Sequence, residues 1–420
     1  MVSTIYIAKN VYGGDGMGRL GDGRVVFVPG AFAGENVKAE IVEEKRHFVR
    51  ARLVEVVEAS PERLTPEQIA ADLPDGPVPG MVYSALSAKG EQAAKIQQLQ
   101  EFFDRARIPI PAIRPSEAPS VFHYRNKVVY HFAREKGAWA LGYRTEPSHE
   151  ILDVTSDPLA RPEINAKLPE IRRHVMTLLT QGAESVRQSV ARKANVTVRW
   201  SAKSGVQWWL GDAPQTPVVL KETTCGRTFE VPADGFYQVN PEVGEALAKA
   251  VVAEFRSAPT AEILDLYCGV GVFGLACAEG DTRLTGIESG RQAVDFARRN
   301  AAAQGIASAR FYAEQVGRNL RRIRVTDRTT VIVDPPRGGM EPGVPQWLAD
   351  AKAPRIFYVS CDPATLMRDL KTICRNYDVA SVHWFNMFPR TARFETLVVL
   401  RRRPAAANGQ SSSDNTTTRT

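Results

Sequence analysis

The chain has 420 residues, of which 44% are hydrophobic and 24% are charged, a length that accommodates two or three domains with their own cores. Lys and Arg number 54 against 47 Asp and Glu, giving a formal net charge of +7, which suits a polyanionic partner or an ordinary solubilising surface. No apolar run reaches the ~20 residues that cross a bilayer, and residues 1–10 lack the pattern of a targeting segment, so we expect a cytoplasmic protein without membrane contact. The five cysteines form neither a disulfide framework nor a metal-binding pattern, and no metal is predicted.

Residues 1–57 are predicted to form a small β barrel of the OB-like kind. Glycine-rich turns at 13–23 precede three β-branched stretches within 25–57, and short strands joined by glycine turns are typical of closed barrels. Basic residues lie around Phe27 and Phe48, a combination that suits phosphate and base contacts with RNA. A solvated barrel surface remains the alternative.

Residues 58–236 are predicted to form a linker and a central mixed α/β domain. Proline and acidic residues are frequent in 58–80, which is typical of a linker. Apolar spacing predicts an amphipathic helix over 89–107, and the segment 89–120 is a candidate to pack on the following domain. Further elements are expected as a helix near 163–180 and strands at 196–200 and 206–210.

Residues 237–402 are predicted to form a Rossmann-like domain. Strands and helices alternate from Ile263 onward, which implies a mostly parallel sheet with right-handed crossovers. Asn240 and Pro241 are a typical start for a helix over 242–255, and Ser289 is expected to cap the next-but-one helix. The polar tail 403–420 lacks apolar periodicity and is expected to be disordered.

The stretch 263–288 carries the first functional signal. A short apolar strand, a loop with Gly269 and Gly271, an apolar helix and a second strand ending at Glu288 form a βαβ nucleotide-binding unit. The glycine offsets differ from the dinucleotide fingerprint, and the acidic Asp265 before the loop suits S-adenosylmethionine better than a pyrophosphate. On this stretch alone, an ordinary βα turn that uses glycine for tight packing remains the alternative.

Two later strands end in residues that can do chemistry. One precedes Asp334 and a double proline, and the other ends at Cys361 before Asp362 and Pro363, which are predicted to be the cap and the first residue of a helix that runs to about Arg375. Ligands of open α/β sheets bind outside the carboxyl ends of the strands, so these side chains should share one crevice. A thiol at a helix N-terminus is favoured as the thiolate, which is the better nucleophile; a buried inert cysteine is the alternative.

Glu395 lies between an arginine-containing loop and the last apolar strand. A carboxylate at the start of a buried strand is costly unless it is paired or used in chemistry. The sequence therefore predicts a general base at Glu395, with a salt bridge to Arg390 or Arg393 as the alternative.

With these residues assembled, the chain resembles the RNA 5-methyluridine methyltransferase family, class I enzymes with an N-terminal TRAM domain. The resemblance spans nearly the whole chain in the family's order. It is carried by the barrel, Tyr124-Arg125-Asn126, Phe236–Asn240, Asp265–Gly271, Asp334-Pro-Pro-Arg, Val359–Pro363 and Phe388-Pro-x-Thr followed by Glu395.

The resemblance implies transfer of a methyl group from S-adenosylmethionine to C5 of a uridine in structured RNA. Cys361 would add to C6 of the uracil, and Glu395 would remove the C5 proton. Since C6 is inaccessible in a stacked helix, the target uridine would be splayed into the pocket. The cofactor contacts implied by position are Gln238, Tyr267, Gly269, Gly271, Val272, Glu288, Gln315 and Asp334.

One feature departs from the family. Many relatives hold an iron–sulfur cluster through four cysteines, but here no cysteine precedes Cys225, and Asp157 stands where the fourth would be. Because four thiolates are needed, we predict no cluster and expect packing around 73–86 in its place. The barrel favours 23S ribosomal RNA over transfer RNA by family analogy only, and a monomer is the default expectation. A non-catalytic RNA-binding or folding factor and a cytosine-C5 RNA methyltransferase are the competing hypotheses.

Overall fold

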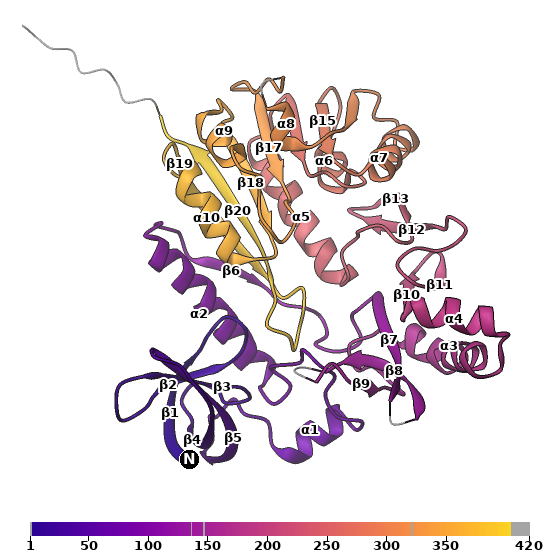
Figure 1. Ribbon diagram of the computed structural model, residues 1–420. Coiled ribbons are helices and arrows are strands. Elements are labelled where there is room, and N and C mark those ends of the chain that lie inside the picture. Colours follow the sequence, from indigo (N-terminus) through magenta and orange to yellow (C-terminus); the bar gives the residue numbers. More distant parts are fainter. Residues whose placement is uncertain (1, 136, 146–147, 321, 405–420) are drawn as a thin grey trace, which may run out of the picture.

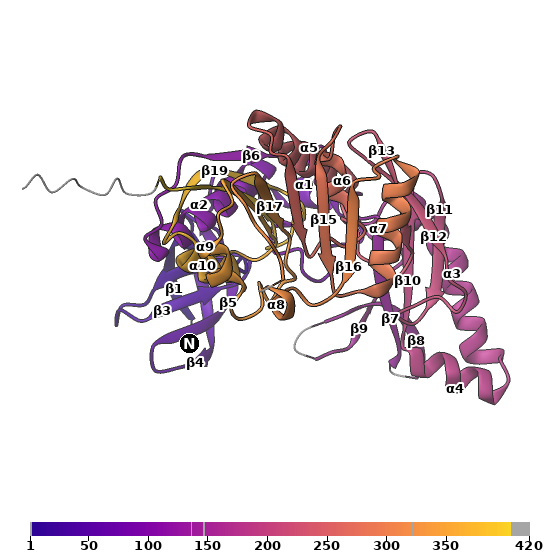
Figure 2. The same cartoon turned by 90° about the horizontal axis from the view of Figure 1, so that it is seen from above.

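The computed structural model describes residues 2–135, 137–145, 148–320 and 322–404, so most of the predicted tail, from residue 405, lies outside the described residues. Three bodies of different construction meet: a small barrel, a central α/β region and a larger unit built on an eight-stranded sheet (Figure 1). Seen from above, the barrel and the central region flank the large sheet on opposite sides (Figure 2). Among the described residues, no helix combines the length and the apolar character needed to span a membrane.

The N-terminal barrel closes in the strand order β1-β2-β3-β5-β4. Alternate residues point inward, and Ile5, Ile7, Val26 and Val28 are almost fully buried in its core. Gly18 is required where β2 crosses β1, because a Cβ there would lie 2.4 Å from the Tyr6 carbonyl oxygen. The strands are β1 (Val2–Asn10), β2 (Gly16–Arg19), β3 (Val25–Val28), β4 (Asn36–Glu44) and β5 (Phe48–Glu58).

The segment after the barrel connects all three bodies. α1 (Pro66–Asp72) starts with a capping box formed by Thr65 and Gln68, and lies within the predicted linker. α2 (Ala88–Ala106) packs on a helix of the large unit, and β6 (Ile113–Ser116) adds to its sheet as a parallel edge strand. Figure 1 shows α2 running between the barrel and the large sheet.

The central region holds a five-stranded sheet in the order β11-β10-β7-β8-β9, with one helix packed on β10 and β11 and a second helix packed on the first. Its core includes Leu73, Val78 and Met81 from the preceding segment, packed with Tyr124 and Tyr130. A two-stranded hairpin leads from this region into the large unit. The elements are β7 (Lys127–Glu135), β8 (Ala138–Arg144), β9 (Ile151–Asp153), α3 (Pro162–Gln181), α4 (Glu184–Lys193), β10 (Asn195–Ser201), β11 (Gly205–Leu210), β12 (Val219–Thr224) and β13 (Arg227–Pro232).

Asp157, which stands where the family's fourth cluster cysteine would be, organises a buried hydrogen-bond network. Its carboxylate accepts from the hydroxyls of Tyr143 at 2.6 Å and Tyr130 at 3.3 Å. It also accepts from the amides of Leu159 at 2.9 Å and Ala160 at 3.3 Å. Asp157 is fully buried, so the network joins strands β7 and β8 to the start of α3 without a metal.

Asp157→Ala should therefore lower the free energy of unfolding by about 3 kcal/mol or more, because two tyrosine hydroxyls and two amides lose their acceptor inside the core. Urea unfolding followed by tyrosine and tryptophan fluorescence measures the change. Asp281→Ala, at an exposed turn, serves as the control and should stay within about 0.5 kcal/mol. A loss no larger than that of the control would show that the network is not a structural centre.

The large unit contains a sheet in the order β16-β15-β14-β17-β18-β20-β19-β6, whose first five strands are parallel. Ile263 faces the core with α5, and its neighbour Leu264 faces the core with α2 and α10, so the strand is buried on both faces. This architecture confirms the predicted fold class. The elements are α5 (Pro241–Ser257), β14 (Glu262–Leu266), α6 (Val272–Cys277), β15 (Arg283–Glu288), α7 (Arg291–Ala303), β16 (Ala309–Ala313), α8 (Val316–Asn319), β17 (Thr329–Val333), α9 (Val344–Asp350), β18 (Arg355–Ser360), α10 (Pro363–Ile373), β19 (Tyr377–Phe385) and β20 (Glu395–Arg402).

Two of the three predicted helix caps are correct. Asn240 accepts a hydrogen bond from the Val243 amide at the start of α5, and Asp362 caps α10. The prediction for Ser289 is wrong, since Gly290 occupies the cap position of α7 without a side-chain bond. The Ser289 hydroxyl instead donates to the Glu288 carboxylate at 3.0 Å, which draws it away from the helix amides.

Candidate active site

Cys361 lies directly after β18 and before the first turn of α10. β18 enters the site between β17 and β20, so the position of the thiol is fixed by pairing on both sides. The Asp362 carboxylate caps α10 by accepting from the amides of Ala364 and Thr365, each at 3.0 Å. The free amides of the helix are thus bonded to Asp362.

Strand register brings Cys361 and Glu395 to the same edge of the sheet. β20 runs antiparallel to β18, and Ser360 lies opposite Thr396. One step further along each strand, Cys361 and Glu395 therefore occupy opposed positions. On the other side of β18, Val333 pairs with Tyr358, which places Asp334 at the same edge. Asp334 and Cys361, which are predicted to share a crevice, follow two adjacent parallel strands, and Glu395 begins the antiparallel strand beside them.

The arginines that could have neutralised Glu395 have other partners. Arg390 donates its amide to Glu91 and its guanidinium to the Leu86 carbonyl, and Arg393 pairs with Asp362 at 3.2 Å. Glu395 is 4% exposed, and within the described part of the chain no ion pair to it is formed. The salt-bridge alternative for Glu395 is therefore wrong, and the carboxylate remains available.

Burial and neighbouring charge tune these carboxylates. Burial, and then the Asp334 carboxylate, raises the pKa of Glu395 well above its usual range, while Arg337 acts in the opposite direction. Burial, followed by the Glu288 carboxylate, raises the pKa of Asp334 to about 7. Strongly shifted acids beside a cysteine are typical of a site that moves protons.

The expectation that Cys361 is held as a thiolate is not met in the free protein. Burial, and then the carboxylates of Glu395 and Asp334, raises the pKa of Cys361 to about 12. The helix N-terminus does not offset these effects, because Asp362 takes its amides and adds a further negative charge. The raised pKa therefore favours the protonated thiol in the free protein.

Alkylation of Cys361 by iodoacetamide should accordingly accelerate about tenfold per pH unit from neutral to mildly alkaline pH, without a plateau, because the thiolate fraction grows with pH below a high pKa. Peptide mass spectrometry on the alkylated protein gives the rate at this residue. The urea-unfolded chain is the control, and its alkylation should level off near the ordinary thiol pKa of about 8.5. A plateau near neutral pH in the folded protein would contradict the high pKa.

A hollow beside this edge collects most of the predicted cofactor residues. It is lined by Gln238, Tyr267, Gly269, Val272 and Asp334, together with the β12 end and Phe236. The loop after β14 turns through positive φ angles at Tyr267, Gly269 and Gly271, namely 61°, 53° and 88°. A Cβ on Gly271 would press on Leu275 and Phe311, so this loop is shaped to leave room on the opposite side.

Two carboxylates that contact the backbone of this loop and its helix, without lining the hollow themselves, fit S-adenosylmethionine. Glu288, at the end of β15, accepts the Gly269 amide at 3.3 Å, which places a carboxylate beside the glycine loop where ribose hydroxyls bind. Asp265 carries a buried Oδ1 without a hydrogen-bond partner, while its Oδ2 accepts from Gly274 at 2.9 Å. Burial raises the pKa of Asp265 to about 8, assisted by Asp334 and Glu288. An orphaned buried oxygen below the loop is consistent with a missing cationic ligand.

Three of the predicted cofactor residues, Gly271, Glu288 and Gln315, do not line this hollow. Gln315 occupies the cap position of α8 after β16, one strand beyond Glu288, whereas Val272 lines the hollow from the first turn of α6. Both assignments remain predictions.

The described residues contain no cluster of side chains suited to binding a metal ion. Across the described residues, no group of three or more His, Cys, Asp or Glu side chains could hold an ion. All five cysteines are free, and four of them lie in the large unit, away from the central region where relatives carry a cluster. The residues present do not fit an iron–sulfur cluster.

The comparisons with known proteins agree with this geometry. Residues 219–403 match the tRNA (Uracil-5-)-methyltransferase family model, and residues 4–54 match the TRAM domain model. An uncharacterised RNA methyltransferase from Thermosynechococcus vestitus is 31% identical over 92% of this chain and 95% of its own. The chain belongs to the RNA uracil-C5 methyltransferase family.

Further relatives of this uracil-C5 methyltransferase extend the comparison. The 23S rRNA (uracil(1939)-C(5))-methyltransferase of Chromohalobacter salexigens is 27% identical over 94% of this chain and 88% of its own. The crystal structure of the Pyrococcus abyssi tRNA (uracil-54, C5)-methyltransferase, in complex with S-adenosyl-L-homocysteine, matches with a TM-score of 0.70 at 21% identity. That match covers 94% of this chain and 100% of the other. The chain is thus an S-adenosylmethionine-dependent RNA methyltransferase with an RNA-binding TRAM domain.

Tyr12, from the TRAM barrel, is a residue of the methyltransferase site that sequence reasoning missed. Its hydroxyl accepts from Arg393 at 3.0 Å and donates to Asp362 at 3.5 Å, although Asp362 is 350 positions away. Asp362 follows Cys361, and Arg393 lies two residues before Glu395. The ring of Tyr12 packs edge-on against the ring of Phe394. Tyr12 therefore bridges the two segments that carry the nucleophile and base candidates.

Tyr12→Phe should lower kcat by roughly tenfold with little change in KM for either substrate, because loosening the bridge misplaces reacting groups rather than binding surface. Steady-state methyl transfer to RNA measures both constants. Tyr6→Phe, at a barrel position that is 57% exposed, is the matched control and should behave as wild type. An unchanged kcat for Tyr12→Phe would show that the barrel does not position these segments.

Proposed function

We propose that this methyltransferase acts on C5 of a specific uridine in structured RNA, with Cys361 as nucleophile and Glu395 as base. The observation that carries the proposal is the opposed placement of Cys361 and an unpaired, buried Glu395 at one sheet edge, beside the cofactor hollow. The proposed cofactor contacts are Gln238, Tyr267, Gly269, Gly271, Val272, Glu288, Gln315 and Asp334.

The chain's own residues supply nucleophilic and proton-transfer chemistry. Cys361 gives its thiol proton to solvent water, and the Sγ electron pair forms the bond to C6 of the uracil while the C5–C6 π electrons move onto C5 and O4 as negative charge. Bound S-adenosylmethionine supplies an electrophilic methyl group for C5. Glu395 then accepts the C5 proton, and the electron pair expels Cys361 as the S–C6 bond breaks.

The proposed substrate is 23S ribosomal RNA rather than transfer RNA. Support comes from the TRAM domain match and from the 23S rRNA specificity named for the Chromohalobacter salexigens relative. Since C6 is reached only from a base outside the stack, the target uridine must be extruded into the site.

Nucleoside mass spectrometry tests the substrate and the product together. Purified protein and S-adenosylmethionine are incubated separately with 23S rRNA and bulk transfer RNA from a strain that lacks 5-methyluridine. The proposal expects 5-methyluridine in the 23S fraction. Modification of transfer RNA alone would contradict the ribosomal assignment, and 5-methylcytidine would contradict uracil as the target base.

A further inference from the structure

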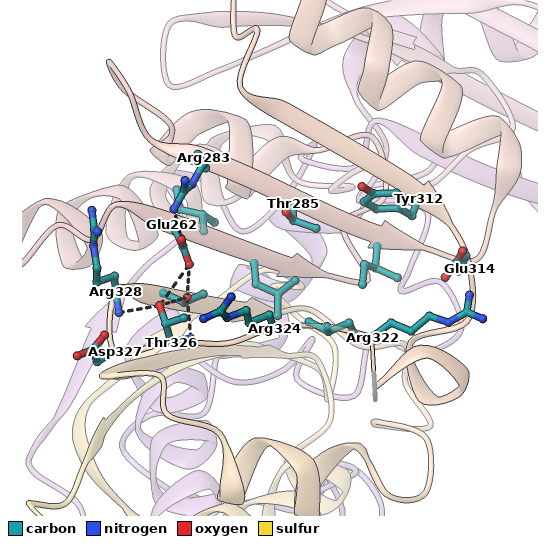
Figure 3. Close-up of a pocket in the computed structure, with 15 residues that line it drawn as sticks. Glu262, Arg283, Thr285, Tyr312, Glu314, Arg322, Arg324, Thr326, Asp327 and Arg328 are labelled. Atoms are coloured by element: carbon teal, nitrogen blue, oxygen red, sulfur yellow. Dashed lines mark hydrogen bonds and ion pairs between the residues drawn. The ribbon is translucent and has the colours of Figure 1, made fainter.

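A second hollow lies on a face of the large sheet, away from the candidate active site. Helices α5, α6 and α7 cover one face of β14, β15 and β16. On the other face, the described residues of the connection from β16 to β17 contain only the four-residue α8, so this connection places no longer helix over β15 and β16. Figure 3 shows the resulting hollow, with strand side chains along one side and the segment 322–329 along the other.

The hollow contains an exposed aromatic ring. Tyr312, on β16, is 47% exposed and is the one large hydrophobic side chain noted as exposed among the described residues 237–404. It lies beside Thr285 on the neighbouring strand (Figure 3). A flat ring on an open sheet face offers a surface on which an unstacked base can lie.

Positive charge lies along the opposite side of the hollow from this ring (Figure 3). Arg322, Arg324 and Arg328 line the hollow and are exposed, and within the described part of the chain they form no ion pair. The carboxylate of Glu262 is already used, because it pairs with Arg283 and accepts from Thr329 at 2.8 Å.

The chain on either side of these arginines is also rich in positive charge. Its described residues between 309 and 328 include the arginines at 310, 318, 322, 324 and 328, against the acids Glu314 and Asp327. Figure 3 shows Arg322 extending toward Glu314. The Glu314 amide donates to the Glu288 carbonyl at 2.8 Å, so this end of the hollow adjoins the strand ends that hold the cofactor hollow.

We propose that this face binds a single-stranded segment of the substrate RNA outside the target uridine, with Tyr312 stacking on a base and Arg322 and Arg324 contacting phosphates. The proposal rests on the proposed function, because it requires RNA as the substrate. Its contribution is to affinity and register, since phosphate contacts position a nucleic acid and stacking is tolerant of sequence.

The test is binding of a 23S rRNA fragment to the full chain at several salt concentrations. Arg322→Gln together with Arg324→Gln should weaken binding at least about tenfold and lower the magnitude of the slope of log K against log salt by about 1.4, as expected for two lost phosphate contacts on a single strand. Tyr312→Ala should weaken binding at least about fivefold with an unchanged salt slope. The matched control, Lys352→Gln with Lys371→Gln, removes the same charge from exposed positions elsewhere on the domain and should change neither quantity beyond a factor of about two.

Each outcome decides the proposal. Wild-type affinity and salt slope in the arginine and Tyr312 variants would overturn the proposal, and this is also the result expected if the face binds another protein instead of RNA. Methylation of the fragment by the wild-type protein would in that case leave the proposed function standing. Equal weakening by the control pair would reduce the effect to net charge and would also overturn it. A wild-type protein that neither binds nor methylates the fragment would contradict the proposed function itself.

Discussion

Cys361→Ala is expected to lower methyl transfer to RNA by roughly 10⁴-fold or more, because without the thiol nothing adds to C6 and C5 of uracil stays a poor nucleophile. Radiolabel transfer from S-adenosylmethionine to the RNA measures the loss. Binding of S-adenosylmethionine, followed by calorimetry, should remain near wild type, since Cys361 does not line the cofactor hollow.

Cys374→Ala is the matched control for this substitution. Cys374 lies at the other end of α10, where the pKa of its thiol is also raised by burial, to about 11, but it is remote from the strand ends that meet at the site. Its removal should leave methyl transfer within about threefold of wild type. Appreciable methyl transfer by Cys361→Ala would show that another group activates C5 of the uracil.

Glu395→Gln is expected to trap the protein on its RNA. The amide cannot accept the C5 proton, so elimination stalls after Cys361 has bonded to C6 and the base has been methylated. A protein–RNA species that survives denaturing gel electrophoresis should accumulate, and turnover should fall at least about 10³-fold. The swap preserves shape, and no hydrogen bond from the described residues to the carboxylate is lost.

The double variant Cys361→Ala, Glu395→Gln controls for adventitious cross-linking and should give no stable species. If the single variant turns over normally, the base lies elsewhere, and Asp334 becomes the next candidate because its pKa of about 7 is in the appropriate range. If it is inactive without forming an adduct, Glu395 acts before the C6 bond forms.

Sequence reasoning worked best where the signal was local. The side chains of Asn240 and Asp362, each followed by proline, identified two helix starts, and alternating apolar strands gave the order of the large unit. The convergence of Asp334 and Cys361 follows from the same strand endings, because parallel strands present their carboxyl ends at one edge, and Glu395 joins them because β20 runs antiparallel and begins there.

Signals that depend on distant residues could not be read. Tyr12 reaches the site across 350 positions, and nothing near it in the sequence marks that contact. The prediction of a thiolate at Cys361 took only the adjacent helix into account, whereas burial and the carboxylates of Glu395 and Asp334 dominate the pKa of the thiol. Ser289 failed as a cap because Glu288, one residue away, offers its hydroxyl a better acceptor.

Attack by Cys361 at C6 of the uracil, followed by loss of the C5 proton, is tested most directly by the release of tritium from C5. Ribosomal RNA lacking 5-methyluridine and tritiated at uracil C5 is incubated with wild-type protein and S-adenosylmethionine. The wild-type protein should release one tritium to water for each methyl group transferred, and Cys361→Ala should release none. Methyl transfer to RNA without tritium release, or release that persists in Cys361→Ala, would contradict this mechanism.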